Sequence, residues 1–342
     1  MAFEVLQVLA YLVLCVSVVF YCILDGFDLG VGALHLFSKR DEDRRIFLNA
    51  IGPLWDGNEV WLVIIGGALF AAFPVDYAVI FSSFYTPIMI LLAGVIFRAV
   101  AIEFRSKVHS ASWRSAWDIL FSVASIIIIF CVGVLIANLI EGIQIDETGL
   151  FTGTFWGFFG YYPILVGIMS ISLFMMHGLV FLLMKTEGDL HDRIRTWMPA
   201  VMTFLAVFYV IVSLVTFFKA PHMVERFADY PILFIMPAIA ILAIVNTPWQ
   251  VHKQNDGWAF ISSSIAIIFL FILFGIGTFP IMVRSSINPE LFSITLYNAS
   301  SAIKTLGVVL TIVAIGIPIV LAYGWYIYHI FRGKVRLDSA SY

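Results

Sequence analysis

Residues 54–73 read LWDGNEVWLVIIGGALFAAF, an apolar run in which the two acids and the asparagine all lie near the start. A helix needs about 20 mostly apolar residues to cross a hydrocarbon core of roughly 30 Å. The strands of a transmembrane barrel are only about 9–11 residues long, and they alternate in polarity. This stretch is longer and does not alternate, so it predicts a transmembrane helix.

The same apolar pattern recurs along the whole chain. The sequence is 62% hydrophobic and only 12% charged, with a mean hydropathy of +1.02, which excludes a soluble protein and a disordered one. The predicted spans are 5–36, 54–73, 77–101, 117–140, 161–184, 198–218, 231–251, 258–282 and 303–331. We therefore predict an all-α integral membrane protein with nine transmembrane helices. No loop is long enough for a soluble domain, so we expect residues 1–342 to form a single polytopic membrane domain.

Lysine and arginine gather on one side of these spans. Most of the 19 basic residues lie in alternate loops, beginning with the loop after the first span, and in the C-terminal tail. Short cytoplasmic loops are enriched in these residues, so we predict an N-terminus outside the cell and a cytoplasmic C-terminus. The opposite side keeps only Lys219, Arg226, Arg284 and Lys304. The net charge of -3 and the lack of a basic stripe argue against a nucleic-acid partner.

Two pairs of acids lie in or beside apolar spans, where each carboxylate costs about 2.5–3.5 kcal/mol on insertion scales. Asp25 and Asp28 lie late in the first span, and Asp56 and Glu59 lie at the start of the second. Residues at i and i+3 share a helix face, and the predicted orientation places both pairs in the cytoplasmic half of the membrane. Since intramembrane chains of Asp, Glu and His commonly relay protons, we interpret the four acids as a proton pathway.

Four other polar residues fall in the same half of the membrane and are candidate supporting residues. They are Asn58, Arg98, Glu103 and His177. Each feature also has a plainer interpretation. Arg98 could extend to the membrane interface, Glu103 could pair with Lys107, and His177 could be a hydrogen-bonded core histidine. The first acid pair could lie at the lipid headgroups, and the second could simply favour the dipole at a helix N-terminus.

The sequence predicts no cofactor or metal site in this chain. A membrane haem protein needs axial His, Met or Cys ligands, yet only His177 lies well inside a span. The methionines are scattered in apolar runs, and nucleotide-binding and iron–sulfur motifs are absent from the sequence. We therefore expect no catalytic residue, cofactor ligand or metal ligand in this chain itself.

The motifs around the acids resemble those of one membrane enzyme family, subunit II of the bacterial cytochrome bd quinol oxidases. The specific matches are GFDLGVG at 26–32, IGPLWDGNEVWLVIIGGALFAAFPVDYA at 51–78 and FRAVAIEFRSK at 97–107. Weaker matches are TEGDLHDR at 186–193, NTPW at 246–249 and GTFPIMVRSS at 277–286. The nine-span layout is also similar, so the resemblance covers essentially the whole chain.

The resemblance implies a non-haem subunit of a quinol:O2 oxidoreductase in the bacterial cell membrane. It implies a heterodimer with subunit I, which would carry haem b and haem d and use menaquinol or ubiquinol. A small single-helix subunit, membrane lipid and quinone are further partners that the resemblance allows. Conserved acids of the family's cytoplasmic proton pathway match Asp25, Asp28 and Asp56 here. Some members carry Gln at the position of Glu59, which implies a smaller role for that residue.

Two other functions fit carboxylates inside a membrane. One is a proton-coupled secondary transporter, although the paired interrupted spans typical of such proteins are not evident in the sequence. The other is a purely structural membrane subunit. For a proton pathway, we expect Asp56 and Glu59 to form the entrance and Asp25 and Asp28 the deeper relay.

Overall fold

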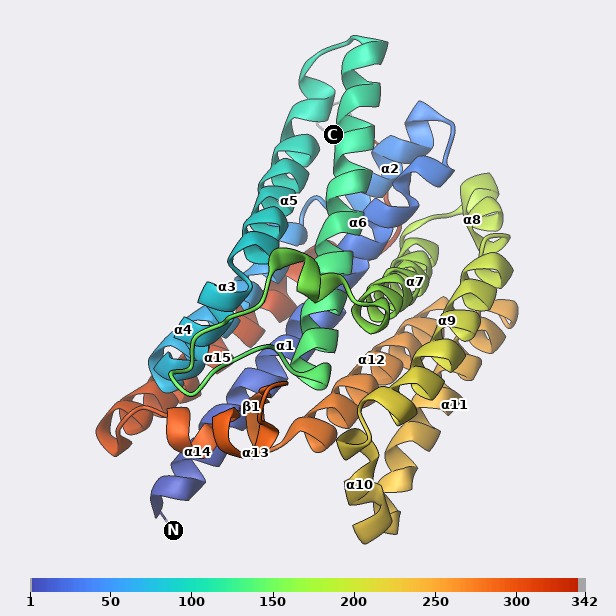
Figure 1. Cartoon of the computed structure of the whole chain (residues 1–342). Coiled ribbons are helices and arrows are strands. Elements are labelled where there is room, and N and C mark those ends of the chain that lie inside the picture. The colour runs from blue at the N-terminus through green and yellow to red at the C-terminus, as the bar shows by residue number, and fades with distance from the viewer. Residues whose placement is uncertain (1, 338–342) are drawn as a thin grey trace.

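The chain folds as a bundle of long helices (Figure 1). The computed structural model describes residues 2–337, so Met1 and residues 338–342 of the predicted domain lie outside the described part. Within it, eight helices are long and apolar enough to cross a membrane. There are nine if the bent pair of α2 (Asp41–Ile51) and α3 (Trp55–Ala72) is one span. The predicted helical membrane fold is confirmed, whereas the orientation of the termini stays a prediction.

The other long helices follow the predicted spans closely. They are α1 (Ala2–Leu34), α5 (Tyr85–Phe104), α6 (Ala111–Glu141), α7 (Tyr161–Lys185), α9 (Met198–Lys219), α11 (Ile235–His252), α12 (Asp256–Thr278) and α15 (Ile303–Ile330). The connections contain the short helices α4 (Pro74–Ser83), α8 (Gly188–Arg195), α10 (His222–Asp229), α13 (Pro289–Phe292) and α14 (Leu296–Ala299). They also contain the 3-10 turns η1 (His35–Phe37), η2 (Arg105–Lys107), η3 (Phe155–Phe159) and η4 (Pro231–Phe234). A small antiparallel sheet of β1 (Ile281–Val283) and β2 (Ile294–Thr295) is the one departure from helical structure among the named elements.

Proline explains two differences from the predicted spans. The span predicted at 77–101 is interrupted at Phe84, between α4 and α5. Pro87 has no N–H with which to bond the carbonyl of Ser83, so the helical hydrogen-bond ladder is broken at this point. The span predicted at 258–282 ends early, at Thr278, because Pro280 disfavours a helical conformation at the residue before it.

Helices α1 and α7 form the centre of the bundle. Helix α1 packs against α3, α6, α7, α12 and α15, and α7 also packs against α6, α9 and α12. The backbones of α1 and α7 nearly touch, since a Cβ on Gly30 would lie 1.9 Å from the carbonyl oxygen of Phe174. A Cβ on Gly178 would lie 2.4 Å from the carbonyl carbon of Gly30. Glycine permits this close helix approach, which encloses the second half of α1.

The short helices mark the two ends of the bundle (Figure 1). Helices α2 and α8 lie at one end, and the start of α1 lies at the other with α10, α13 and α14. Asp25 and Asp28 are late in α1 and therefore belong to the half nearer α2. This is the half that the loop charges predict to be cytoplasmic.

Candidate functional site

A buried arginine links acids from two other helices. Arg98 on α5 is 0% exposed, and its Nη2 donates a hydrogen bond to Asp25 Oδ1 on α1 at 2.6 Å. The same nitrogen also contacts Glu59 Oε1 on α3. Arg98 therefore does not extend to the membrane interface, and that plainer interpretation is wrong. Its guanidinium instead holds two carboxylates together inside the bundle.

A second chain of hydrogen bonds holds Asp28. The Nδ2 of Asn58 donates to Asp28 Oδ2 at 2.7 Å and to the carbonyl of Leu24 at 3.2 Å. The hydroxyl of Tyr328, on α15, donates to Asn58 Oδ1 at 2.9 Å. The other carboxylate oxygen of Asp28, Oδ1, is buried and has no hydrogen-bond partner among the described residues. Asn58 thus contacts Asp28 directly, and Tyr328 is a further member of this chain of contacts that we did not expect from the sequence.

The two acids of α1 share one buried helix face. Asp25 is 1% exposed and Asp28 is fully buried, and each lies within range of the other's charge and of the charge of Arg98. Helix α1 continues to Leu34. Both acids therefore lie inside the bundle rather than on its surface, whereas their depth in the membrane stays a prediction.

The charges in this cluster do not balance. One guanidinium, that of Arg98, faces the carboxyl groups of Asp25, Asp28 and Glu59. An uncompensated buried charge costs several kcal/mol even after relaxation. A group of three carboxyls around one cation is therefore suited to binding and releasing protons, because a proton bound by one carboxyl changes the proton affinity of the other two.

The second predicted acid pair divides between two environments. The side chain of Glu59 is 17% exposed and forms an ion pair with Arg98, whereas Asp56 is exposed in the first turn of α3. The charge of Asp56 still acts on Glu59. Glu59 therefore lies between an exposed carboxylate and the buried cluster.

His177, another predicted supporting residue, makes its hydrogen bonds outside the carboxylate cluster. His177 Nδ1 lies 2.8 Å from Ser263 Oγ, and its Nε2 lies 2.9 Å from the carbonyl of Ile23. Its ring stacks on Phe260 with centroids 4.8 Å apart, so the structure favours the interpretation of His177 as a core histidine. Glu103 is half-buried in the last turn of α5.

A separate buried ion network, which we did not predict, ties helix ends together. Asp118, near the start of α6, is 1% exposed and lies 2.5 Å from Arg105 Nε, 2.6 Å from His35 Nε2 and 3.0 Å from Arg44 Nη1. These partners come from η2, η1 and α2. The available sequence signal was an acid just inside the predicted span 117–140.

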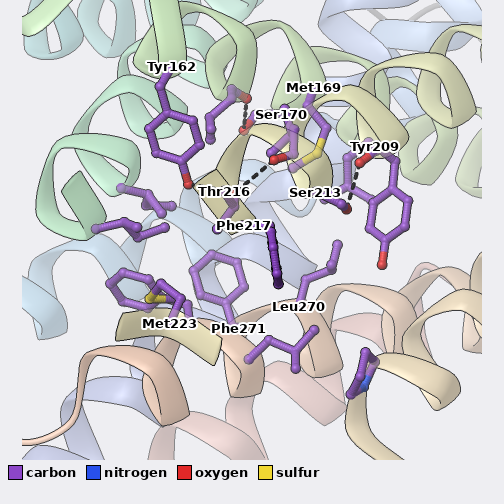
Figure 2. A pocket seen from close by; sticks show the side chains of 18 of the residues that line it. Tyr162, Met169, Ser170, Tyr209, Ser213, Thr216, Phe217, Met223, Leu270 and Phe271 are labelled. Atoms are coloured by element: carbon purple, nitrogen blue, oxygen red, sulfur yellow. Dashed lines mark hydrogen bonds between the residues drawn. The ribbon is translucent and has the colours of Figure 1, made fainter. Parts of the chain in front are cut away.

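Neither His177 nor the apolar cavity beside α7 offers a haem its axial ligands. Among residues 2–337, no group of three or more His, Cys, Asp or Glu side chains could hold a metal ion. Both ring nitrogens of His177 are already engaged. A cavity of about 380 Å³ beside α7 is lined by Met169 and Met223 but by no histidine (Figure 2). A His/His or His/Met pair of axial ligands is therefore not offered there.

Sequence comparison finds one family across the chain. The family model for cytochrome bd terminal oxidase subunit II matches residues 6–331. Cytochrome bd-I ubiquinol oxidase subunit 2 of Escherichia coli (strain K12) is 32% identical over 368 residues, which cover 98% of this chain and 97% of that protein. Cytochrome bd ubiquinol oxidase subunit 2 of Bacillus subtilis (strain 168) is 32% identical over 326 residues, which cover 95% of each.

The fold is also found in a solved oxidase. A chain in the structure of bd oxidase from Geobacillus thermodenitrificans matches with a TM-score of 0.79, over 96% of this chain and 98% of that one, at 17% sequence identity. The relatives are subunits of cytochrome bd quinol oxidases, which are oxidoreductases of the bacterial membrane. The chain therefore belongs to the cytochrome bd terminal oxidase subunit II family and is a multi-pass membrane subunit of a bacterial quinol oxidase.

Proposed function

We propose that this chain supplies the cytoplasmic-side proton-uptake pathway of the oxidase. It would form a heterodimer with the haem-bearing subunit I. Haems b and d in that partner would supply the redox chemistry that oxidises menaquinol or ubiquinol and reduces O2 to water. Water formation consumes protons, and the carboxylates of this chain would deliver them from the cytoplasm.

The observation that carries this proposal is the shared contact of Asp25 and Glu59 with one nitrogen of Arg98. Since each carboxylate lies within hydrogen-bond distance of the same atom, their oxygens are within about 5 Å of each other. A single bridging water spans such a separation. Arginine itself does not deprotonate in proteins, so Arg98 would position the carboxylates rather than carry the proton.

The order of the acids follows from their burial. Asp56 is exposed, Glu59 is partly exposed, and Asp25 and Asp28 are buried. A proton taken up at Asp56 would pass to Glu59, then to Asp25, and then to Asp28. The unpartnered Oδ1 of Asp28 is suited to accepting it. In this order of transfer, Asp56 and Glu59 form the entrance and Asp25 and Asp28 form the deeper relay.

The exposed face of α3 is suited to contact with subunit I. A charged side chain that faces lipid is costly unless protein or water covers it. One exposed stripe of α3 carries such a charge beside small and apolar residues at helical spacing: Asp56, Val60, Val63, Gly67 and Phe70. Subunit I packed on this stripe would cover Asp56 and bring the partner close to Glu59.

The test is a variant with both Asp25→Asn and Asp28→Asn, copurified with subunit I. We expect unchanged b- and d-type absorption, and a loss of quinol-driven O2 consumption of about tenfold or more. The matched control is Asp76→Asn, because Asp76 on α4 is a buried acid whose carboxylate makes no hydrogen bond to any described residue. Wild-type activity in the double variant would exclude the pathway. A colourless homo-oligomer that is active alone would exclude the oxidase role.

A further inference from the structure

A cavity lies apart from the carboxylates, among α6, α7, α9, α10, α11 and α12. Its volume is about 380 Å³, within the range of roughly 300–1,000 Å³ typical of small-molecule sites. Figure 2 shows Met169, Phe217, Leu270 and Phe271 around the open space. The lining is almost entirely aliphatic and aromatic, so its occupant must be largely apolar.

The hydroxyl groups in the lining have little to offer a polar ligand. Ser170, Ser213 and Thr216 each donate to a carbonyl of their own helix, at 2.9, 2.7 and 2.7 Å. Because the Thr216 hydrogen is used in this way, Tyr162 donates its own to Thr216 Oγ1 at 3.0 Å. Among the described lining residues, the Tyr209 hydroxyl remains as a donor. A quinone carries two carbonyls that accept hydrogen bonds, whereas a hydrocarbon chain requires none.

The dimensions of the cavity match one leaflet of a bilayer. Its wall on α7 extends from Tyr162 to Phe174, a rise of about 18 Å at 1.5 Å per residue. Half of a hydrocarbon core of roughly 30 Å is similar in depth. Phe217 and Phe234 line the cavity and are 59% and 58% exposed on the outer surface of the bundle. A chain can therefore enter from the surrounding lipid.

Helix α10 closes the end of the cavity and places positive charge there. Met223 and Phe227 of α10 are buried and line the cavity. Arg226, between them in sequence, donates to the carbonyl of Phe279 and makes no ion pair with any described residue. Arg284 is a second basic residue near the start of α10. Its carbonyl accepts from the N–H of Ile143 at 2.9 Å, and His222 Nε2 lies 3.1 Å from the carbonyl of Ile140. Burial and the charge of Arg284 lower the pKa of His222.

Neither of these two arginines makes an ion pair with a described residue. Glu141 pairs with Lys219 at 3.5 Å. Glu225 and Asp229 are exposed on α10, whereas Arg226 is half-buried on the side of the bundle. The charge at the end of the cavity is therefore complementary to a phosphate group that enters from the membrane surface.

We propose that this cavity binds one acyl chain of a membrane phospholipid, with the lipid phosphate beside Arg226 and Arg284. The apolar lining, the depth of one leaflet, and two arginines without an ion pair to any described residue all favour this occupant. A transmembrane helix is far too large for 380 Å³. The bound chain would fill the space between α7, α9 and α12 and strengthen their packing.

The experiment uses the purified heterodimer in lipid nanodiscs that contain phosphatidylglycerol with a photoreactive diazirine at the end of one acyl chain. We expect cross-links at the deep wall of the cavity, on α7 near Leu173 and on α12 near Leu270. In Ser213→Phe, which fills the cavity, labelling should fall by about tenfold. The control is Ala206→Phe, since Ala206 is an exposed residue of the same helix that does not line the cavity.

A second variant, Leu270→Trp, also fills the cavity. For each variant, haem absorption and the ratio of the two subunits report whether the complex is assembled. Labelling that persists in both filling variants would overturn the proposal. So would a quinone that is extracted in stoichiometric amount from the wild type and lost from Ser213→Phe. A diacylglycerol with the same diazirine chain but no phosphate should label several-fold less. Equal labelling would overturn the role of the arginines.

Discussion

Arg98 Nη2 lies 2.6 Å from Asp25 Oδ1 and joins α5 to α1 at a point where neither side chain is more than 1% exposed. Two other guanidinium nitrogens, Nε and Nη1, make no hydrogen bond with any described residue. Both carboxylates, those of Asp25 and Glu59, therefore contact the same nitrogen of Arg98, Nη2. A buried ion pair is weak evidence for stability, and its position among further carboxylates suits a role in proton transfer.

Asp25→Asn should lower oxidase activity on its own. The substitution keeps the size of the side chain and a carbonyl oxygen for Arg98, but it removes a group that can be loaded with a proton. We expect quinol-driven O2 consumption to fall by about tenfold or more, with the haem content of the complex unchanged. An oxygen electrode measures the rate, and a rate above half of the wild-type value would count against a relay through Asp25.

Arg98→Gln should destabilise the complex. It leaves the carboxylates of Asp25 and Glu59 buried without a cation, and breaking one partner of a buried pair costs about 3–5 kcal/mol. Thermal loss of the haem absorption of the complex measures this effect. Arg98→Lys keeps the charge and should recover part of the loss, although lysine cannot reproduce the fixed geometry of a guanidinium. Equal stability of the glutamine variant and the wild type would show that the ion pair is dispensable.

Glu59→Gln should have a smaller effect than Asp25→Asn or Asp56→Asn. The introduced amide would still present an oxygen to Arg98, and glutamine stands at this position in some members of the family that the sequence resembles. Steady-state rates of the three variants, each normalised to haem content, give the ranking. A loss in Glu59→Gln as large as that in Asp25→Asn would place Glu59 on the obligatory path.

Tyr328→Phe should change activity without preventing assembly. It removes the hydroxyl that orients the Asn58 amide toward Asp28, and one such hydrogen bond contributes about 1 kcal/mol, or roughly fivefold in rate. We expect a loss of this size together with a displaced pH profile of O2 consumption, which a merely structural contact would not produce. Tyr326→Phe is the control, because Tyr326 is exposed on the same helix. An unchanged pH profile would remove Tyr328 from the pathway.

The burial of the α1 acids could be predicted from sequence because charged residues are rare in apolar spans. The division between Asp56 and Glu59 could not be predicted from their spacing alone. Residues three apart on a helix still differ by about 60° in direction, which is enough to expose one and bury the other against Arg98. Which of the two faces the bundle depends on how α3 packs.

Long-range partners were the least predictable part of the site. Tyr328 is separated from Asn58 by 270 positions in the sequence, and a tyrosine near a helix end is ordinarily explained by the membrane interface. The role of His177 was equally hard to predict, because its partners Ser263 and the carbonyl of Ile23 are 86 and 154 positions away in the sequence. The break between α4 and α5, by contrast, has a visible cause in Pro87.

The most direct test of the central claim is proton uptake itself. The heterodimer is reconstituted into liposomes and fully reduced, and O2 is added while a pH-sensitive dye reports protons on the predicted cytoplasmic side. With Asp25→Asn, we predict that uptake slows by about tenfold or more, while haem absorption and quinol binding match the wild type. Uptake at the wild-type rate would contradict a proton pathway through this chain.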